Sequence, residues 1–98
     1  MKLTRDGCPL CSGACRVVGT ADQGKEVELA CANCTIFRIT TDAAALLLDE
    51  PGARREMYAV LARRCPADHV ILISASASDL AYDCIAIRRL KALKVHPR

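Results

Sequence analysis

Residues 8–34 read CPLCSGACRVVGTADQGKEVELACANC, and this stretch holds five of the seven cysteines in the 98-residue chain. Four of the five form two Cys-x-x-Cys pairs, Cys8/Cys11 and Cys31/Cys34, which nineteen residues separate. Two such pairs are the usual donors of a tetrahedral site, in which four thiolate sulfurs each lie about 2.3 Å from one metal ion. The spacing therefore predicts that Cys8, Cys11, Cys31 and Cys34 bind one metal ion together.

The residues around and between the two pairs are predicted to form three short strands. Residues 26–29 alternate polar and apolar side chains, as a strand with one solvent-facing side does, and residues 21–25 form a turn. Residues 14–20 and 26–30 are therefore expected to form a hairpin that folds one cysteine pair back onto the other. Residues 35–39 are rich in β-branched and aromatic side chains and are expected to form a third strand.

From about residue 6 to residue 40 the pattern resembles the zinc-ribbon class, in which a β-hairpin bridges two cysteine knuckles. The first knuckle, Cys8-Pro9-Leu10-Cys11, also carries the proline that often follows the first cysteine in that class. The resemblance implies a structural zinc ion and no particular activity. The sequence departs from the class at Ser12 and Thr35, where such knuckles commonly have glycine. A treble-clef arrangement, the alternative, would begin a helix at the second pair, where residues 35–39 favour a strand.

We expect the cofactor to be one Zn²⁺ ion. Four thiolates also suit a rubredoxin-like iron centre, so iron is the competing metal. Disulfides are the other alternative, and the odd number of cysteines and an expected reducing cytosol both disfavour them. Whichever metal binds, four sulfur ligands leave no open position for water or substrate, which predicts a structural rather than a catalytic ion.

Three cysteines lie outside the predicted ligand set. Cys15 follows the first pair and is the alternative to Cys11 as a ligand, although the two-residue spacing and the symmetry with the second pair favour Cys11. Cys84 is expected in the core, as free cysteines usually are. Cys65 is expected to pack at a helix end, and a reactive thiol is the alternative for this residue.

The rest of the chain is predicted to contain three helices and one strand. Thr40 is a candidate N-cap for a first helix, which Pro51 ends before a second helix begins. Residues 69–73 are a continuous apolar run, which predicts a buried strand, and a last helix is expected from an N-cap at Ser78 to about Leu93. The predicted core-facing positions are Ala53, Met57, Val60, Leu61 and Arg64 on the second helix and Leu80, Cys84, Ile87 and Leu90 on the last.

These elements predict an α+β fold with a small N-terminal zinc ribbon of three antiparallel strands, packed with about three helices and one further buried strand. The length of residues 1–98 is that of a single domain. It divides into a zinc-ribbon subregion, residues 6–40, and a helix-helix-strand-helix subregion, residues 41–98. The strand at 70–73 is expected to pair with the third strand of the ribbon, and the helical crossover between them would make this pair parallel.

The formal net charge is +3 when every cysteine is counted as neutral. Four thiolates around one Zn²⁺ ion add about −2 and lower the total to about +1, so the global charge gives little support for nucleic-acid binding. Locally, Arg88, Arg89, Lys91 and Lys94 follow the last acidic residue, Asp83. These four cations are candidate contacts to a partner or to phosphates, although cations also stabilise the end of a helix.

The sequence has no run of about 20 apolar residues, the length of a membrane helix, and no apolar segment of a signal peptide. We therefore expect a cytoplasmic protein that does not bind a membrane.

No catalytic set is recognisable in the sequence, which lacks a nucleophile elbow, a phosphate-binding loop and a glycine-rich dinucleotide turn. We therefore expect a non-enzymatic zinc protein that serves as an interaction or adaptor module for a protein partner. One alternative is a nucleic-acid-binding accessory protein that uses the basic C-terminal helix, and another is a thiol redox or metal sensor. The sequence does not define the oligomeric state.

Overall fold

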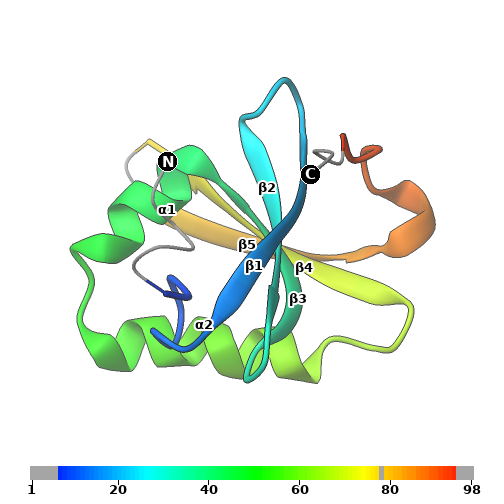
Figure 1. Ribbon diagram of the computed structural model, residues 1–98. Coiled ribbons are helices and arrows are strands. Elements are labelled where there is room, and N and C mark those ends of the chain that lie inside the picture. Colours follow the sequence, from blue (N-terminus) through cyan, green and yellow to red (C-terminus); the bar gives the residue numbers. More distant parts are fainter. Residues whose placement is uncertain (1–6, 78, 95–98) are drawn as a thin grey trace.

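The computed structural model describes residues 7–77 and 79–94, and its strands form one five-stranded sheet (Figure 1). The strands lie in the order β1-β2-β3-β4-β5, and all neighbours are antiparallel except β3 and β4, which are parallel. The predicted α+β class is confirmed. The elements are β1 (Cys15–Ala21), β2 (Glu26–Cys31), β3 (Thr35–Thr40), α1 (Thr41–Leu48), α2 (Gly52–Arg64), β4 (His69–Ser76), β5 (Asp79–Ala86) and the short 3-10 helix η1 (Ile87–Arg89).

The three N-terminal strands form where the sequence predicts them. Asp22, Gln23 and Gly24 all have positive φ in the β1–β2 turn, and Lys25 N–H donates to the Asp22 carbonyl at 3.0 Å. The three strands are not a separate ribbon, however. Because β3 also pairs with β4, they are part of the same sheet as β4 and β5.

The helices α1 and α2 form the crossover from β3 to β4, and these two strands pair in parallel as predicted. Thr40 is the N-cap of α1, since its Oγ1 accepts a hydrogen bond from Ala43 N–H at 3.2 Å. Both helices pack against β3 and β4 (Figure 1). The core therefore lies between the helices and one face of the sheet, and its fully buried large side chains include Leu29, Phe37, Ile39, Leu47, Ile71 and Ile73.

The predicted core face of α2 is correct only in part, because Leu61 packs against the core whereas Ala53, Met57 and Arg64 are exposed. The helix buries Tyr58, Ala59 and Ala62, while Met57 of the predicted face is 44% exposed. The small side chains of Ala59 and Ala62 let the helix lie close to the sheet. Tyr58 then meets Tyr82 of β5 edge to face, with ring centroids 6.1 Å apart.

The predicted last helix is also wrong, because residues 79–86 form β5. Apolar residues in this segment fit both periods, since Leu80 and Cys84 have helical spacing while Leu80, Tyr82 and Cys84 alternate as in a strand. The edge of β4 favours the strand, because β5 pairs with it along the full length of both strands and satisfies backbone groups there. The predicted N-cap, Ser78, lies outside the described residues. The described part of the chain contains two α-helices instead of the predicted three.

Residues 90–94, here called the C-terminal strap, return from η1 to β1 (orange to red in Figure 1). Thr20 N–H donates to the Lys94 carbonyl at 3.0 Å, and Lys94 N–H donates to the Thr20 carbonyl at 2.6 Å. Between these ends, the Arg38 guanidinium donates to the Lys91 carbonyl at 2.7 Å. The strap thus crosses the sheet face that the helices leave open.

The strap changes the surroundings of β2. Glu26 and Glu28 were expected on a solvent-facing side, yet they are only 5% and 9% exposed. The expectation was wrong because the strap, which the sequence assigned to a helix, lies over this side. In the described ranges, neither helix has the length and apolarity needed to cross a membrane.

Candidate metal centre

The first cysteine pair lies on a tight loop that precedes β1. Cys8 N–H donates to the Gly13 carbonyl, and Ser12 N–H donates to the Cys8 carbonyl, both at 2.8 Å. Leu10 N–H then points at Cys8 Sγ, and Gly13 N–H points at Cys11 Sγ, each at 3.4 Å. Amide hydrogen bonds of this kind stabilise the negative charge of a thiolate.

The second pair lies on the turn between β2 and β3. Cys31 is the last residue of β2, Cys34 directly precedes β3, and Cys31 pairs with Thr35 across the two strands. Asn33 Nδ2 lies 3.8 Å from Cys11 Sγ and so reaches from this turn to the first loop. The sheet register thus fixes the second pair, and the first pair folds over it.

Ser12 and Thr35, the residues after the two pairs, have a backbone conformation that favours glycine. Ser12 has φ 64° and Thr35 has φ 65°, in the left-handed region that glycine enters without a steric cost. Both turns thus have the shape that suits glycine best, although neither position is a glycine.

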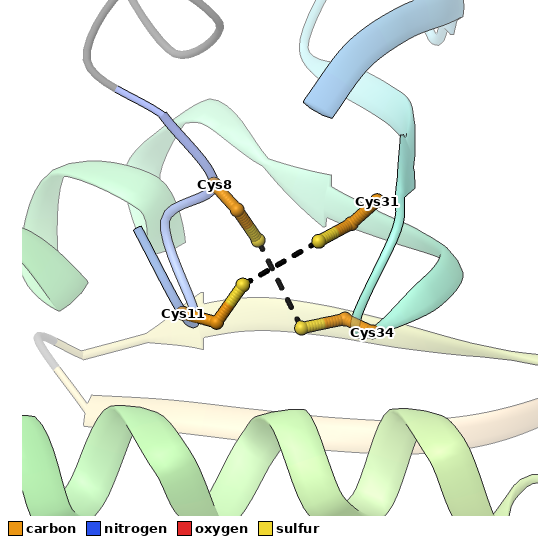
Figure 2. Close-up of side chains that lie close together, drawn as sticks. All are labelled: Cys8, Cys11, Cys31 and Cys34. Carbon is orange, nitrogen blue, oxygen red and sulfur yellow. Dashed lines mark hydrogen bonds between the residues drawn. The ribbon is translucent and has the colours of Figure 1, made fainter. Parts of the chain in front are cut away.

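The four cysteine side chains point toward one another from the two loops (Figure 2). Their sulfurs all lie within 4.8 Å of one another, with Cys8 Sγ 3.9 Å from Cys34 Sγ and Cys11 Sγ 3.4 Å from Cys31 Sγ. In a regular tetrahedral site with Zn–S bonds of about 2.3 Å, neighbouring sulfurs are about 3.8 Å apart. The arrangement is therefore consistent with a zinc-binding site.

The thiol pKa values also suit a cation. Burial raises the pKa of Cys8 to about 12, and burial followed by the charge of Cys8 raises the pKa of Cys34. Burial acts to raise the pKa of Cys11 as well, but hydrogen bonds from Gly13 N–H and from neighbouring thiols outweigh it and lower this pKa to about 7. These shifts disfavour the thiolate forms of Cys8 and Cys34. A divalent ion bound among the sulfurs would supply the positive charge that stabilises these two thiolates.

Cys15 borders the cluster but is not one of the four converging residues. It begins β1 and pairs with Cys31 across the strands, and burial followed by the charges of Cys31 and Cys11 raises its pKa. Its exclusion from the ligand set remains a prediction.

Cys65 packs against the core at the end of α2, as predicted, whereas Cys84 differs from its predicted position in the core. The structure joins them in a disulfide between the end of α2 and β5, with their Cα atoms 6.5 Å apart. Cys84 is exposed on β5 and so is not a core residue, because the helix that was expected to bury it does not form. The two cysteines are 19 positions apart along the chain, and the pairing of β5 with β4 brings them together.

The four C-terminal cations do not share a helix face. Arg88 and Arg89 lie exposed in η1. Lys91 and Lys94 belong to the strap, where Lys91 Nζ lies 3.3 Å from an Asp22 carboxylate oxygen and the Lys94 backbone binds β1. The basic helix expected from the sequence is therefore absent from the described segment.

A buried ionic cluster was not predicted from the sequence. Arg38 Nε donates to Glu28 at 2.8 Å and Arg38 Nη1 donates to Glu26 at 3.0 Å, beneath the strap. The sequence places two glutamates on one predicted strand and an arginine on the next. Only the sheet register, in which Glu28 lies opposite Arg38, shows that these side chains meet.

The sulfur cluster, the disulfide and the ionic cluster are thus the chemically distinctive groups of this chain. Comparison with protein-family models, with curated proteins and with solved structures finds no match to it.

Proposed function

We propose that the chain is a non-enzymatic protein with one structural Zn²⁺ ion bound by Cys8, Cys11, Cys31 and Cys34, and that it serves as an interaction module. The observation that carries this proposal is the convergence of four sulfurs, from two loops far apart in the sequence, at near-tetrahedral spacing. Iron is the alternative metal, because it accepts the same four ligands.

The ion would tie the first loop to the sheet. Residues 7–14 belong to no helix or strand, yet Cys8, Pro9 and Leu10 are buried. Arg55 of α2 also holds this loop, since its Nε donates to the Pro9 carbonyl at 3.0 Å and its Nη2 donates to Ser12 Oγ at 3.2 Å. Each such bond contributes on the order of 1 kcal/mol. A structural zinc ion contributes about 10 kcal/mol of apparent binding energy, so it would stabilise the position of the first loop far more than these hydrogen bonds do.

Metal analysis combined with unfolding tests this role. We expect one zinc ion per chain, and we expect chelation at pH 7 to lower the free energy of unfolding by several kcal/mol. The variant Cys34→Ser should lose both the metal and the stability that the metal provides. The matched control Cys15→Ser removes a cysteine outside the four proposed ligands and should keep both. A chain that is equally stable with and without metal would contradict the structural role. A visible absorption band from thiolate-to-iron charge transfer would show that the bound metal is iron and not zinc.

Exposed aliphatic side chains support a protein partner. Ile36 and Ile87 are 45% and 52% exposed and line the same hollow. The nucleic-acid alternative depended on a basic C-terminal helix, which is replaced here by β5, η1 and the strap. No specific contact in the described residues favours that alternative.

A thiol redox role is the second candidate function, and the Cys65–Cys84 pairing supports it. Cys84 is exposed and Cys65 is half-buried, so small thiols can reach the bond. When the bond forms, the two thiols give up two electrons and two protons. A small disulfide such as oxidised glutathione takes these up and splits into two thiols.

Equilibration of the protein with mixtures of reduced and oxidised glutathione, followed by alkylation and mass spectrometry, tests this candidate. We expect a reversible two-thiol change at Cys65 and Cys84 that Cys84→Ser abolishes, with the zinc content unchanged. A pair that keeps one oxidation state across the whole cytosolic range of mixtures would rule out the redox role.

A further inference from the structure

A carboxylate and an imidazole lie on the turn that leads from Cys65 to β4. Asp68 is the last residue of this turn and His69 is the first residue of β4. His69 N–H donates to the Pro66 carbonyl at 3.0 Å, which closes the turn, and His69 Nδ1 lies 2.7 Å from Asp68 Oδ1. A carboxylate, an imidazole and a cysteine are thus gathered at a place separate from the four converging cysteines.

The sheet register places His69 beside the second cysteine of the disulfide. Cys84 lies opposite Ile71 on β4, and Ala86 lies opposite His69. Residues 69 and 71 therefore lie on the same face of the sheet, which is the helix face, because Cys84 bonds to Cys65 at the end of α2. His69 is thus a diagonal neighbour of Cys84, and an aromatic ring can span the distance of about 7–8 Å between such positions.

His69 also shares a hollow with the first cysteine of the disulfide. The hollow has a volume of about 270 Å³, and its lining includes Cys65, His69 and Arg63. Cys65 and His69 are both half-buried. The turn, the hollow and the strand register therefore all bring this histidine to the disulfide.

Asp68 determines which nitrogen of His69 can accept a proton. The hydrogen bond from His69 lowers the pKa of Asp68, so this carboxyl group is ionised at neutral pH and can only accept hydrogen bonds. Nδ1 of His69 therefore carries a hydrogen atom, and Nε2 of the neutral ring is the remaining acceptor. The ring is thus oriented as a base.

Thiol–disulfide exchange at Cys65 requires such a base. The thiolate is the form that attacks a disulfide, and an ordinary thiol with a pKa of about 8.5 is mostly protonated at pH 7. Cys65 is also the C-cap of α2, where the partial negative charge of the helix end disfavours a thiolate. A neighbouring group that takes the thiol proton would therefore accelerate the exchange.

One other charged side chain lines the hollow. Arg63 of α2 is 40% exposed and lies 3.8 Å from Glu56. The residues that β3, β4 and η1 contribute to the hollow besides His69 are uncharged, namely Thr35, Ile36, Val70 and Ile87. Arg63 is therefore the group whose charge an experiment must control for.

We propose that His69, oriented by Asp68, takes the proton from Cys65 when the Cys65–Cys84 disulfide forms and returns a proton when the disulfide is reduced. The proposal rests on the thiol redox role, the second candidate function above. His69 is the proton-transfer residue of this scheme, and Asp68 is a positioning residue.

The reaction with oxidised glutathione proceeds in two steps. The exposed Cys84 thiolate attacks one glutathione sulfur, and the first glutathione leaves as a thiolate that takes up the proton that Cys84 lost. Cys65 then passes its proton to His69 Nε2, and its sulfur attacks the Cys84 sulfur. The bond between Cys84 and glutathione breaks, and the second glutathione thiolate takes the proton from His69. The two cysteines lose two electrons and two protons, and oxidised glutathione becomes two thiols.

The rate of the second step tests the proposal on the zinc-loaded full chain. The reduced protein is mixed with oxidised glutathione at concentrations where the rate of Cys65–Cys84 formation no longer rises, and samples from pH 5.5 to pH 9 are quenched, alkylated and analysed by mass spectrometry. We expect His69→Gln to react about tenfold more slowly at pH 7 and to reach half of its maximal rate about one pH unit higher than the wild type. Asp68→Asn should change both quantities in the same direction.

The control Arg63→Gln removes the other charge in the hollow and should keep the wild-type pH profile. The maximal rate at high pH should be the same in all variants, since the thiol then ionises without a base. A wild-type pH profile in His69→Gln overturns the proposal. A rate that falls equally at every pH in His69→Gln also overturns it, because a purely structural role would have this effect.

The same samples distinguish this proposal from the redox role on which it rests. If the wild type forms no Cys65–Cys84 disulfide at any glutathione ratio, the redox role fails and the proton-transfer role fails with it. If the disulfide forms reversibly and His69→Gln keeps the wild-type pH profile, the proton-transfer role alone is contradicted.

Discussion

Thr35 shows how the cysteine turns constrain single residues. It is β-branched and has φ 65°, a conformation in which the side chain crowds the backbone at a cost of about 1–2 kcal/mol. Ser12 occupies the equivalent place in the first loop with φ 64°. Because both turns keep this shape without glycine, the geometry that brings the sulfurs together outweighs the local strain.

Thr35→Gly should therefore stabilise the protein. We expect a gain of about 1 kcal/mol in the free energy of unfolding of the zinc-loaded protein, measured with denaturant, since glycine adopts positive φ without collision and the Thr35 side chain is exposed. Ser12→Gly should gain less, because it also loses the hydrogen bond from Arg55. Thr20→Gly, in β1, is the control and should lose stability. A loss at Thr35→Gly as large as the loss at Thr20→Gly would show that the strain is absent.

Residue spacing was sufficient to find the converging cysteines but not the other distinctive side chains. Cys8, Cys11, Cys31 and Cys34 are recognisable because metal ligands must return at short, fixed intervals. The Arg38 contacts with Glu26 and Glu28 depend on strand register and on the strap above them. Neither can be obtained from the pattern of a single strand.

Among the elements, β5 shows where periodicity alone fails. Its apolar residues fit both a helical and a strand pattern. Pairing with β4, and not its own sequence, therefore determines that this segment forms a strand. The first two helices and β4 were predictable because a threonine cap, a proline and a short apolar run ahead of a small-residue segment marked them. The strap could not be predicted from periodicity or from capping residues, because its position depends on the backbone bridge between Lys94 and Thr20.

Gly19→Ala tests the seating of the strap. A Cβ atom at this position would lie 3.0 Å from the Lys94 carbonyl oxygen and 3.3 Å from Leu93 Cβ, so the strap would have to move away from β1. We expect faster hydrogen exchange at the Thr20 amide, which donates to Lys94, together with a loss of stability of about 1 kcal/mol or more. Gly52→Ala, where a Cβ atom meets nothing within 4 Å, is the control and should leave this exchange unchanged. Unaltered protection of Thr20 in Gly19→Ala would contradict the position of the strap.

At the scale of the whole molecule, the parallel pairing of β3 with β4 links the cysteine cluster to the rest of the fold. The second cysteine pair lies where β2 turns into β3, β3 pairs with β4, and Arg55 of α2 holds the first cysteine loop. A metal ion bound at this end of the sheet would therefore support contacts that reach both subregions. We expect chelation to loosen the first loop and the β2–β3 turn before it affects β4 and β5.

The central claim is that Cys8, Cys11, Cys31 and Cys34 bind one zinc ion as its complete ligand set. X-ray absorption at the zinc edge of the purified protein tests this most directly, since it reports the number and type of the atoms bound to the metal. We predict four sulfur atoms at about 2.3 Å and no nitrogen or oxygen ligand. A shell with two or fewer sulfurs, or one completed by nitrogen or oxygen atoms, would contradict the claim.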